Sequence, residues 1–280
     1  MRSVKQQVIL ITGSTDGLGK HLARVLATRG ATVLLLHGRD RDRGERALRE
    51  IREVSHSRSH RLYLADFSSL EEVRRLAREI EAEQGRLDVL LNNAGIGAGS
   101  PGARRELSRD GNELRLQVNY LAGFLLTGLL LPLLQRSAPA RVVNVASIGQ
   151  APIDFGDPML ERDYNGWRAY RQSKLAQIMF TFELAARLGS MGVAVNALHP
   201  ATLMNTKMVR EALARPMSSV EEGAEATLRL AIAPELEGIT GRYFNGTHEA
   251  RADPQAYDPS ARQRLWDLSE RLCGIRAFPA

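Results

Sequence analysis

The sequence has little of several features that mark other protein classes. It contains one cysteine, Cys273, so no disulfide can form within the chain. A chain without disulfides is typical of a reducing compartment, and we expect a cytoplasmic location. The apolar run that precedes Gly13 is too short for the core of a signal peptide.

Long hydrophobic runs and a strong charge excess are missing too. The longest apolar stretch, 121–134, is shorter than a bilayer crossing and is interrupted by glycine and proline, so we expect a buried helix and no membrane span. Lysine and arginine number 38 against 32 aspartates and glutamates, a formal net charge of +6. Because the arginines lie close to acidic residues on expected helices, we expect no nucleic-acid partner.

What is present is enough apolar material for a sizeable core, since 44% of the 280 residues are hydrophobic. Short runs rich in Val, Leu and Ile, apolar on both faces, alternate with longer amphipathic stretches. We expect strands at 8–11, 32–36, 62–65, 89–91, 142–145, 193–198 and 242–244. Between them we expect helices, among them 18–28, 41–54 and 70–83, the last with a capping box of Ser68 and Glu71.

This alternation of strands and helices predicts the fold class. It indicates an α/β fold, a Rossmann-type doubly wound parallel sheet of about seven strands flanked by helices. No linker or low-complexity stretch divides the chain, so we expect a single domain over residues 1–280. In such sheets, ligands bind at the loops that follow the carboxyl ends of the strands.

A glycine-rich turn follows the first expected strand. Gly13 permits unusual backbone dihedrals, Gly17 lets a pyrophosphate approach the backbone, and Gly19 lets the helix pack against the strand. The amino end of that helix offers free N–H groups to phosphate oxygens. The turn therefore predicts dinucleotide binding by Gly13, Ser14, Thr15, Asp16, Gly17, Leu18 and Gly19. The alternative is an ordinary strand-to-helix turn.

The end of the second strand indicates which dinucleotide is bound. An acidic residue there would bind the adenosine ribose hydroxyls and favour NAD(H), but Gly38 holds that position. Arg39 follows and suits a 2′-phosphate, so we expect NADP(H), with NAD(H) as the less favoured cofactor. The alternative is that Arg39 only begins a solvated helix. Asp66, at the end of the third strand, either meets the adenine amino group or caps the next helix.

Several separated motifs agree with one family. They are TGSTDGLG at 12–19, Asn92-Asn93-Ala94-Gly95, Asn119 in LQVNYLAG, Ser147 ending VVNVAS, and Tyr170 with Lys174 in YRQSKLA. They lie in the family's order between residue 8 and about residue 206, and the chain resembles the short-chain dehydrogenase/reductases. The stretches YNGWRAYRQSKLAQIMFTFELAARL and ARQRLWDLSERL are most similar to the retinol dehydrogenase and WW-domain oxidoreductase branch.

The resemblance implies a set of site residues. The catalytic residues would be Asn119, Ser147, Tyr170 and Lys174, with Lys174 also binding the nicotinamide ribose and Asn119 holding a water. Further cofactor contacts would come from Asp66, Phe67, Asn93, Ala94, Gly95, Tyr170, Lys174, Pro200, Thr202 and Thr206.

The chain also departs from the family pattern at two positions. Ala201 stands where the family usually has a glycine after Pro200, and we expect this difference to alter the loop beside the nicotinamide without abolishing cofactor binding. Asp16 stands where NADP-preferring members often carry a basic residue, so the cofactor preference rests mainly on Arg39.

The proposed chemistry also follows from the residue types themselves. A tyrosine is an effective acid only if its pKa of about 10 falls toward neutrality. A nearby ammonium group favours the phenolate, and Tyr170 and Lys174, four residues apart, share one face of a helix. Ser147, at a strand end, would donate a hydrogen bond to the substrate oxygen. Each residue alone has an ordinary structural explanation; their coincidence behind a nucleotide-binding turn indicates an enzyme.

Two irregular stretches predict cover for the substrate pocket. One is an insertion near 149–168, between Ser147 and Tyr170, and the other is a lid near 201–217. The lid carries Leu203, Met204, Met208, Leu213 and Met217. Methionines form adaptable apolar surfaces, so we expect a largely apolar ketone, aldehyde or secondary alcohol as substrate. Alternatively, these side chains only pack the lid onto the body.

The sequence thus predicts an NADP(H)-dependent carbonyl reductase or alcohol dehydrogenase that acts on the CH–OH group. One alternative is a non-catalytic NADP-binding sensor, which would have no need of Tyr170 or Lys174. Another is a lyase or epimerase with no net redox change. We also expect a homodimer or homotetramer, because helices around 114–134 and 170–188 look too apolar to be covered by the sheet alone. The alternative to an oligomer is cover by the C-terminal segment.

Overall fold

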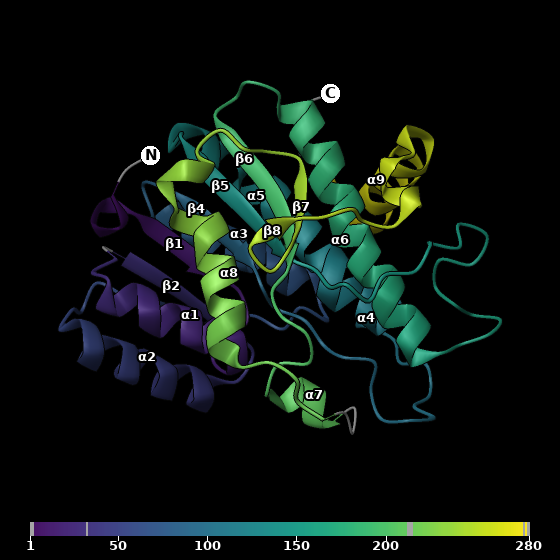
Figure 1. Cartoon of the computed structure of the whole chain (residues 1–280), viewed down its shortest axis with the longest axis horizontal. Coiled ribbons are helices and arrows are strands. Elements are labelled where there is room, and N and C mark those ends of the chain that lie inside the picture. Colours follow the sequence, from purple (N-terminus) through teal and green to yellow (C-terminus); the bar gives the residue numbers. More distant parts are fainter. Residues whose placement is uncertain (1–2, 32, 212–214, 277, 279–280) are drawn as a thin grey trace.

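The computed structural model describes residues 3–31, 33–211, 215–276 and 278. A sheet runs through the molecule in the strand order β3-β2-β1-β4-β5-β6-β7-β8 (Figure 1). Its strands are β1 (Val8–Ile11), β2 (Val33–Gly38), β3 (Arg61–Leu64), β4 (Val89–Asn92), β5 (Ala140–Val145), β6 (Val193–His199), β7 (Arg242–Asn245) and β8 (His248–Glu249). The predicted α/β class is confirmed.

The strands match the expected seven closely, with one addition. β1 to β7 run parallel to their neighbours, whereas β8 pairs antiparallel with β7. β8 has only two residues, too few for an apolar pattern, and the sequence analysis missed it. The predicted start of the second strand, Thr32, lies outside the described residues, and the strand begins at Val33.

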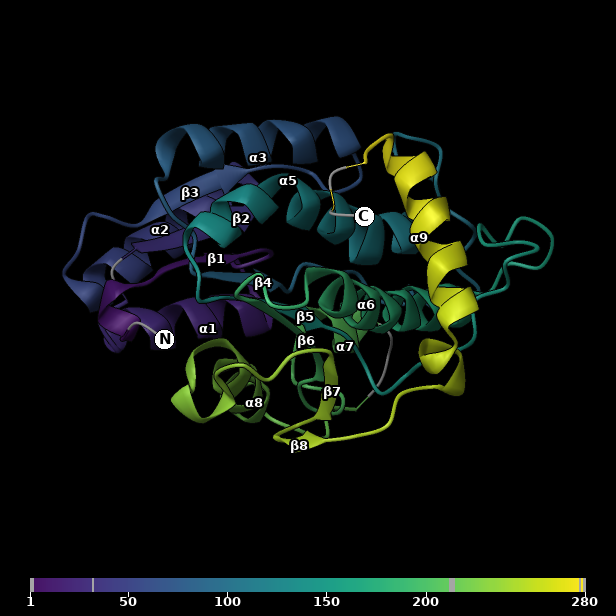
Figure 2. The same ribbon diagram turned by 90° about the horizontal axis from the view of Figure 1, so that it is seen from above.

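Helices cover both faces of the sheet (Figure 2). α1 and α8 pack on one face with part of α2, and α3, α5 and α6 pack on the other. The helices are α1 (Gly17–Thr28), α2 (Arg41–Ser55), α3 (Leu70–Glu83), α4 (Leu114–Leu116), α5 (Ala122–Arg136), α6 (Gly166–Leu188), α7 (Lys207–Glu211), α8 (Val220–Ile232) and α9 (Pro259–Cys273). The predicted capping box of α3 was wrong by one residue, because Ser69 accepts the hydrogen bond from the backbone N–H of Glu72.

One helical stretch, Leu114–Arg136, is long and apolar enough to cross a membrane by length and composition alone. It comprises α4, a π-helical turn (Gln117–Leu121) and α5. In this fold it is a core element, because 78% of its most apolar window is buried. The expectation of a buried helix is therefore confirmed for this stretch.

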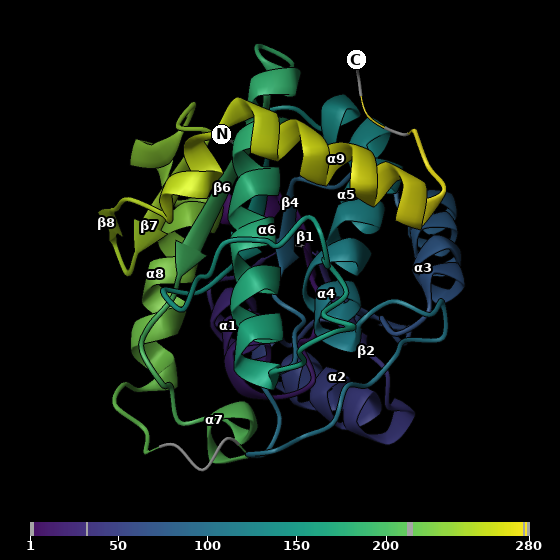
Figure 3. The ribbon, with the colours of Figure 1, turned by 90° about the vertical axis from the view of Figure 1, so that its right-hand side faces the viewer.

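The C-terminal helix α9 lies across α5 and α6 (Figure 3). Trp266 of α9 meets Phe124 edge-on, with ring centroids 5.3 Å apart, and the Arg187 guanidinium lies 4.1 Å from the Trp266 ring centroid. The Tyr120 hydroxyl and Ser269 Oγ are 2.7 Å apart and hydrogen-bonded. The apolar surfaces that suggested an oligomer are thus covered here by the C-terminal segment.

The strand order places a ligand site between β1 and β4. The chain leaves β1 through α1 toward β2, and leaves β4 through α5 toward β5, so the order reverses at this point. In open parallel sheets, the carboxyl ends of the strands on either side of such a reversal form a crevice. The glycine-rich turn after β1 and the Asn92-Asn93-Ala94-Gly95 motif after β4 both lie there.

Candidate active site

The turn after β1 has the shape that a phosphate cradle requires. Gly13 and Gly17 have φ of +65° and +51°, a region that disfavours other residues. A Cβ on Gly13 would lie 2.8 Å from Ala94 Cα, and one on Gly19 would lie 2.2 Å from the Gly13 carbonyl oxygen. Asp16 caps α1 by accepting the Gly17 N–H at 2.7 Å. Helix α1 therefore begins directly behind a turn that admits no larger side chains at Gly13 and Gly19.

Two polar side chains fix this turn against β4. Thr12 Oγ1 accepts the backbone N–H groups of Asn93 at 2.9 Å and Ala94 at 3.0 Å. The Asn93 amide donates to the carbonyls of Thr12 at 2.8 Å and Gly13 at 3.1 Å. The side-chain amide of Asn93, a residue predicted to contact the cofactor, is therefore hydrogen-bonded to the backbone of the turn. The predicted contact Leu18 is likewise a buried core residue.

The end of β2 lies beside the same turn and leaves one cation available. A Cβ on Gly38 would lie 2.5 Å from Thr15 Cγ2, so an acidic side chain does not fit there without movement. Arg39 is exposed and forms no hydrogen bond or ion pair within the described residues. A free guanidinium at this strand end suits a 2′-phosphate.

His37, which the sequence analysis did not select, is a buried residue of β2 that lies against the glycine-rich turn. Its Nδ1 accepts the Gly13 N–H at 3.1 Å, and its ring stacks on Phe67 with centroids 4.3 Å apart. Its backbone N–H donates to Ser14 Oγ at 2.9 Å. Burial lowers the pKa of His37 to about 4, so the ring is neutral at pH 7. Phe67, a predicted contact, is thus a buried partner of His37.

Asp66 lies in the turn before α3 and does not cap that helix, because the N-cap of α3 is Ser69, so the capping alternative was wrong. Its Oδ1 accepts the Ser68 N–H at 2.9 Å, and its Oδ2 lies 3.8 Å from an Arg109 nitrogen. The side chain is partly exposed, so a contact with adenine stays a prediction.

The catalytic pair predicted from the sequence is brought together by β5 and α6. Ser147 follows the carboxyl end of β5, and its Oγ accepts the Gly149 N–H at 3.0 Å. Helix α6 begins at Gly166, where the Asn165 side chain caps it. One turn later, the Tyr170 side chain comes close enough to Ser147 for hydrogen bonding between them to lower the pKa of the phenol. A substrate oxygen at this point would meet two hydroxyl groups.

Lys174 lies one further turn along α6, on the same side as Tyr170. Its Nζ is 5.7 Å from the Tyr170 ring centroid and donates to the Val145 carbonyl and to Gln177 Oε1, each at 2.9 Å. Burial lowers the pKa of Lys174 to about 7, so the amine is only partly charged at neutral pH. Sequence reasoning missed Gln177.

The electrostatics of Tyr170 differ from the expectation. Burial raises the pKa of Tyr170, and the hydrogen bond with Ser147 acts against that rise. The predicted fall of the Tyr170 pKa toward neutrality is therefore not what this structure shows, because burial disfavours the phenolate by more than the Ser147 hydroxyl favours it. At neutral pH Tyr170 carries its proton, the form that donates to a carbonyl.

Asn119 belongs to the π-helical turn Gln117–Leu121, a rare geometry that often occurs at functional sites. Its Oδ1 accepts the Ile96 N–H at 2.7 Å, and its amide donates to Ser173 Oγ at 2.9 Å. A Cβ on Gly95 would lie 3.2 Å from Asn119 Oδ1 and 3.7 Å from Lys174 Nζ. Gly95 therefore lies between the two predicted catalytic side chains and keeps that space open.

The segment after β6 closes the site from the other side. Thr206 lies within 3.5 Å of a Cβ built on Gly17, and Met208 within 2.9 Å of one on Gly97, so this segment spans the two loops. The side chain of Thr202, a predicted cofactor contact, is hydrogen-bonded to His199, with Oγ1 3.1 Å from His199 Nε2. The lid predicted near 201–217 is described except for 212–214, which places Leu213 outside the described residues.

The predicted insertion is a loop beside the first half of α6 (Figure 1). It ends at Asn165, because residues 166–168 already belong to α6. Ile153 and Gln255 hold it through the Ile153 N–H, which donates to Gln255 Oε1 at 2.7 Å. Ile148 and Trp167 flank it, and their side chains are 55% and 43% exposed, so the approach to Tyr170 is partly apolar.

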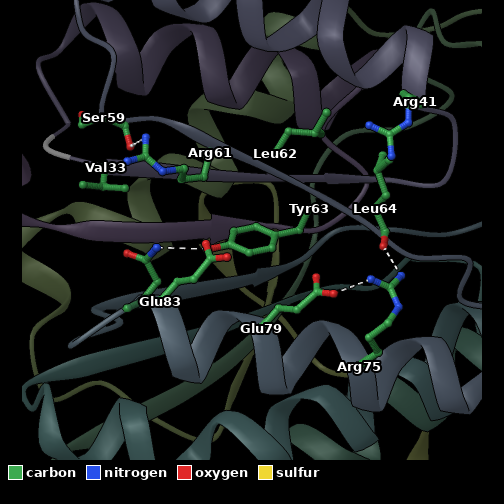
Figure 4. Close-up of a pocket in the computed structure, with 11 residues that line it drawn as sticks. Val33, Arg41, Ser59, Arg61, Leu62, Tyr63, Leu64, Arg75, Glu79 and Glu83 are labelled. Carbon is green, nitrogen blue, oxygen red and sulfur yellow. Dashed lines mark hydrogen bonds and ion pairs between the residues drawn. The ribbon is translucent and has the colours of Figure 1, made fainter.

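A separate cavity of about 870 Å³ lies along the outer edge of β3, away from these residues (Figure 4). Several of its charged groups already have partners: Arg75 bonds Glu79 and the Leu64 carbonyl, and Tyr63 donates to Glu83. None of the predicted site residues lines it. The predicted site residues therefore lie at the carboxyl edge of the sheet, apart from this cavity.

Comparison with known proteins agrees with this geometry. Residues 7–216 match the family model for short chain dehydrogenase. The chain belongs to the short-chain dehydrogenase family. It is 39% identical to mouse retinol dehydrogenase 14, over 96% of this chain and 86% of that protein. It is 38% identical to the zebrafish WW domain-containing oxidoreductase, over 99% of this chain and 71% of that protein. The predicted branch of the family is confirmed.

Solved structures of this family have the same architecture. A protein from Mycobacterium paratuberculosis superposes with a TM-score of 0.81 and 32% identity, over 100% of this chain and 97% of that one. A short chain dehydrogenase from Escherichia coli CFT073, complexed with NADPH, superposes with a TM-score of 0.71 and 26% identity, over 88% of this chain and 99% of that one. The family's Rossmann fold is thus present across the whole chain.

Proposed function

We propose that this short-chain dehydrogenase is an NADP(H)-dependent oxidoreductase. It would move a hydride between the nicotinamide and a carbonyl or hydroxyl carbon of a largely apolar small molecule. The observation that carries the proposal is the joint placement of Ser147, Tyr170 and Lys174 beside the glycine turn. A sensor without catalysis has no need of this arrangement. The arrangement therefore favours an enzyme over a non-catalytic sensor.

The residues at the carboxyl edge of the sheet fit the cofactor. The turn at Gly13 and Gly19 leaves room for a pyrophosphate where any Cβ would collide. The unpaired Arg39 supports a preference for the 2′-phosphate of NADP(H). Solved relatives complexed with NADPH and NADP add to this support. When bound, the cofactor supplies or accepts the hydride.

The protein's own residues supply the proton and the charge stabilisation. In the reduction direction, Tyr170 donates its phenolic proton to the substrate oxygen, and its raised pKa keeps that proton available at neutral pH. The Ser147 hydroxyl steadies the charge that develops on that oxygen. Lys174 then favours the phenolate that Tyr170 leaves behind, in proportion to its own charge.

The surroundings of Tyr170 support an apolar substrate. Trp167 meets the Tyr170 ring edge-on, with centroids 6.2 Å apart, and remains 43% exposed. Ile148 directly follows Ser147, and Met217 of the lid segment is 73% exposed. Exposed apolar side chains next to Ser147 and Tyr170, and on the lid segment, offer apolar surface to a substrate. The names of relatives that act on retinol, an apolar alcohol, point the same way.

The test is a panel of carbonyls and alcohols assayed with NADPH, NADP, NADH and NAD. Net change in absorbance of the reduced nicotinamide, with a preference for apolar compounds and for the phosphorylated cofactor, supports the proposal. Cofactor binding without turnover of any compound would favour the sensor, and conversion without net redox change would favour a lyase or epimerase.

We also propose a cytoplasmic location without a membrane span. The free thiol of Cys273 is buried, and the most apolar helical stretch is 78% buried inside the fold. Fractionation of cells that express the chain tests this proposal, because recovery in the membrane fraction after a salt wash would contradict it.

A further inference from the structure

The lysine of the site has a neighbour whose role the motif does not include. Lys174 is 4% exposed, and its ammonium group donates to the Val145 carbonyl and to Gln177 Oε1. Gln177 is also 4% exposed and stands three residues further along α6. An ammonium group only donates, so the glutamine must present its oxygen to Nζ.

The backbone beneath this pair is held by a buried polar chain. Thr181 Oγ1 donates to the Gln177 carbonyl at 2.8 Å, and the Asn144 amide donates to Thr181 Oγ1 at 2.8 Å. Asn144 also accepts from the Asn92 amide at 2.9 Å. This chain connects α6 to the carboxyl ends of β4 and β5, so Gln177 occupies a fixed place relative to the sheet.

No carboxylate offsets the buried amine in the part of the chain that the structure describes. The titratable groups that face it are Tyr170 on its own helix and His199 at the end of β6, and Lys174 lowers the pKa of His199 further after burial has lowered it. Neither group is an anion at neutral pH. The Lys174 charge is therefore held by two neutral oxygens, one from the backbone and one from Gln177.

We propose that Gln177 is a positioning residue for Lys174, which keeps the ammonium group charged and directs its remaining N–H toward the cofactor side at Gly95. Two of the three Nζ donors are used by Val145 and Gln177. Gly95, which has no side chain, lies beside Nζ, and a Cβ built on it would lie 3.7 Å from Nζ. This inference rests on the cofactor binding in the proposed function, and not on turnover, because it assumes that the cofactor meets Lys174 there.

The experiment measures NADPH affinity by fluorescence across pH 5.5 to 9.5. The affinity should fall as pH rises through the pKa of Lys174, because the charged amine binds the cofactor better than the neutral amine. Gln177→Leu removes an acceptor that favours the charged form, so the midpoint of this fall should move down by about one pH unit. Gln177→Glu places an anion beside the amine, so the midpoint should move up by a similar amount.

Gln172→Leu is the matched control. Gln172 is a second glutamine on α6, 2% exposed, and its side chain accepts the Asp154 N–H rather than a group of the site. Its loss should lower the melting temperature and leave the midpoint where the parent has it. Titration of NADPH itself is common to all four proteins and cancels in the comparison.

Opposite shifts in the two Gln177 variants support the inference, because a merely structural residue would not move the midpoint in two directions. Unchanged midpoints in both variants, or a shift of the same sign, would overturn it. If Gln177→Leu does not fold, the nearly isosteric Gln177→Glu still decides the matter. No substrate enters the measurement, so shifts without turnover of any carbonyl would defeat the proposed function and leave this inference standing.

Discussion

The imidazole of His37 holds the backbone of Gly13: the Gly13 N–H donates to His37 Nδ1 at 3.1 Å. The other ring nitrogen lies 3.1 Å from the Ala65 carbonyl. One neutral side chain at the end of β2 therefore joins the glycine turn after β1 to the end of β3. Because Nδ1 accepts, the proton must be on Nε2, which donates to Ala65.

His37→Leu should loosen this turn and weaken NADPH binding. The substitution leaves the partly buried Gly13 N–H without its acceptor, a loss of at most about 1–3 kcal/mol. We expect a lower melting temperature and a several-fold rise in the dissociation constant for NADPH, measured by fluorescence. His60→Leu is the control, since His60 is buried and accepts the Leu34 N–H away from the turn. Equal effects of both variants on NADPH binding would show that His37 has no special role in the site.

Acid should destabilise the fold between pH 6.5 and 4. Burial lowers the pKa values of both His37 and His199 to about 4, whereas unfolded histidine titrates near 6.5. Between these values the unfolded chain binds more protons, so the free energy of unfolding falls as pH falls, by up to roughly 3 kcal/mol per histidine. Urea unfolding at several pH values measures this, and the dependence should be shallower in His37→Leu. A flat profile in the parent would refute the two pKa shifts.

Arg39→Ala should erase most of the preference for NADPH over NADH. A charged hydrogen bond to the 2′-phosphate predicts a preference of roughly 10- to 100-fold in the parent. The variant should bind NADPH more weakly and bind NADH as before, by fluorescence titration of both. Arg49→Ala, an exposed arginine on α2, should change neither. An unchanged ratio in Arg39→Ala would end the assignment of Arg39 to the phosphate.

The protein should be a monomer, because α9 covers the apolar surfaces of α5 and α6 that would otherwise pair with a second copy. Light scattering at micromolar concentration should then give a mass near 30.9 kDa. Trp266→Ala opens the contact with Phe124 and Arg187 and should cost about 3–5 kcal/mol of unfolding free energy. A mass two or four times larger in the parent would show that another face associates and that the oligomer expected from the sequence forms.

Elements that carry their own pattern were predictable from the sequence. The strands from β1 to β7 are apolar on both faces, and α1 and α3 have regular apolar spacing, so their bounds came out within one or two residues. Ser147, Tyr170 and Lys174 were predictable because they belong to motifs with fixed spacing. Their meeting at one edge follows from the rule that parallel strands end on the same side.

What the sequence did not reveal depends on contacts between distant segments. His37 is an ordinary strand residue until Gly13 and Ala65 are placed beside it. In the sequence Gln177 is an ordinary polar helix residue, and only the structure shows that the Lys174 ammonium group donates to its side chain. The rise in the pKa of Tyr170 was missed because spacing gives the partner of a group but not its burial. The packing of α9 was missed for the same reason: its apolar residues predict a buried face but not the helices, α5 and α6, against which that face packs.

Tyr170→Phe tests the central claim most directly, because it keeps the ring and removes the one hydroxyl that can transfer the proton. Tyr120→Phe is the control: it removes a buried hydroxyl that bonds Ser269, away from the site. Both variants should remain folded by melting and should bind NADPH nearly as the parent does.

The decisive measurement is the turnover number of folded Tyr170→Phe with the best substrate from the carbonyl panel. Positioned acid catalysis contributes about 10²- to 10⁴-fold, so turnover should fall by at least about 10²-fold while Tyr120→Phe keeps the parental rate. A folded Tyr170→Phe protein with near-parental turnover would contradict the assignment of Tyr170 as the proton donor, and with it the mechanism built on Ser147, Tyr170 and Lys174.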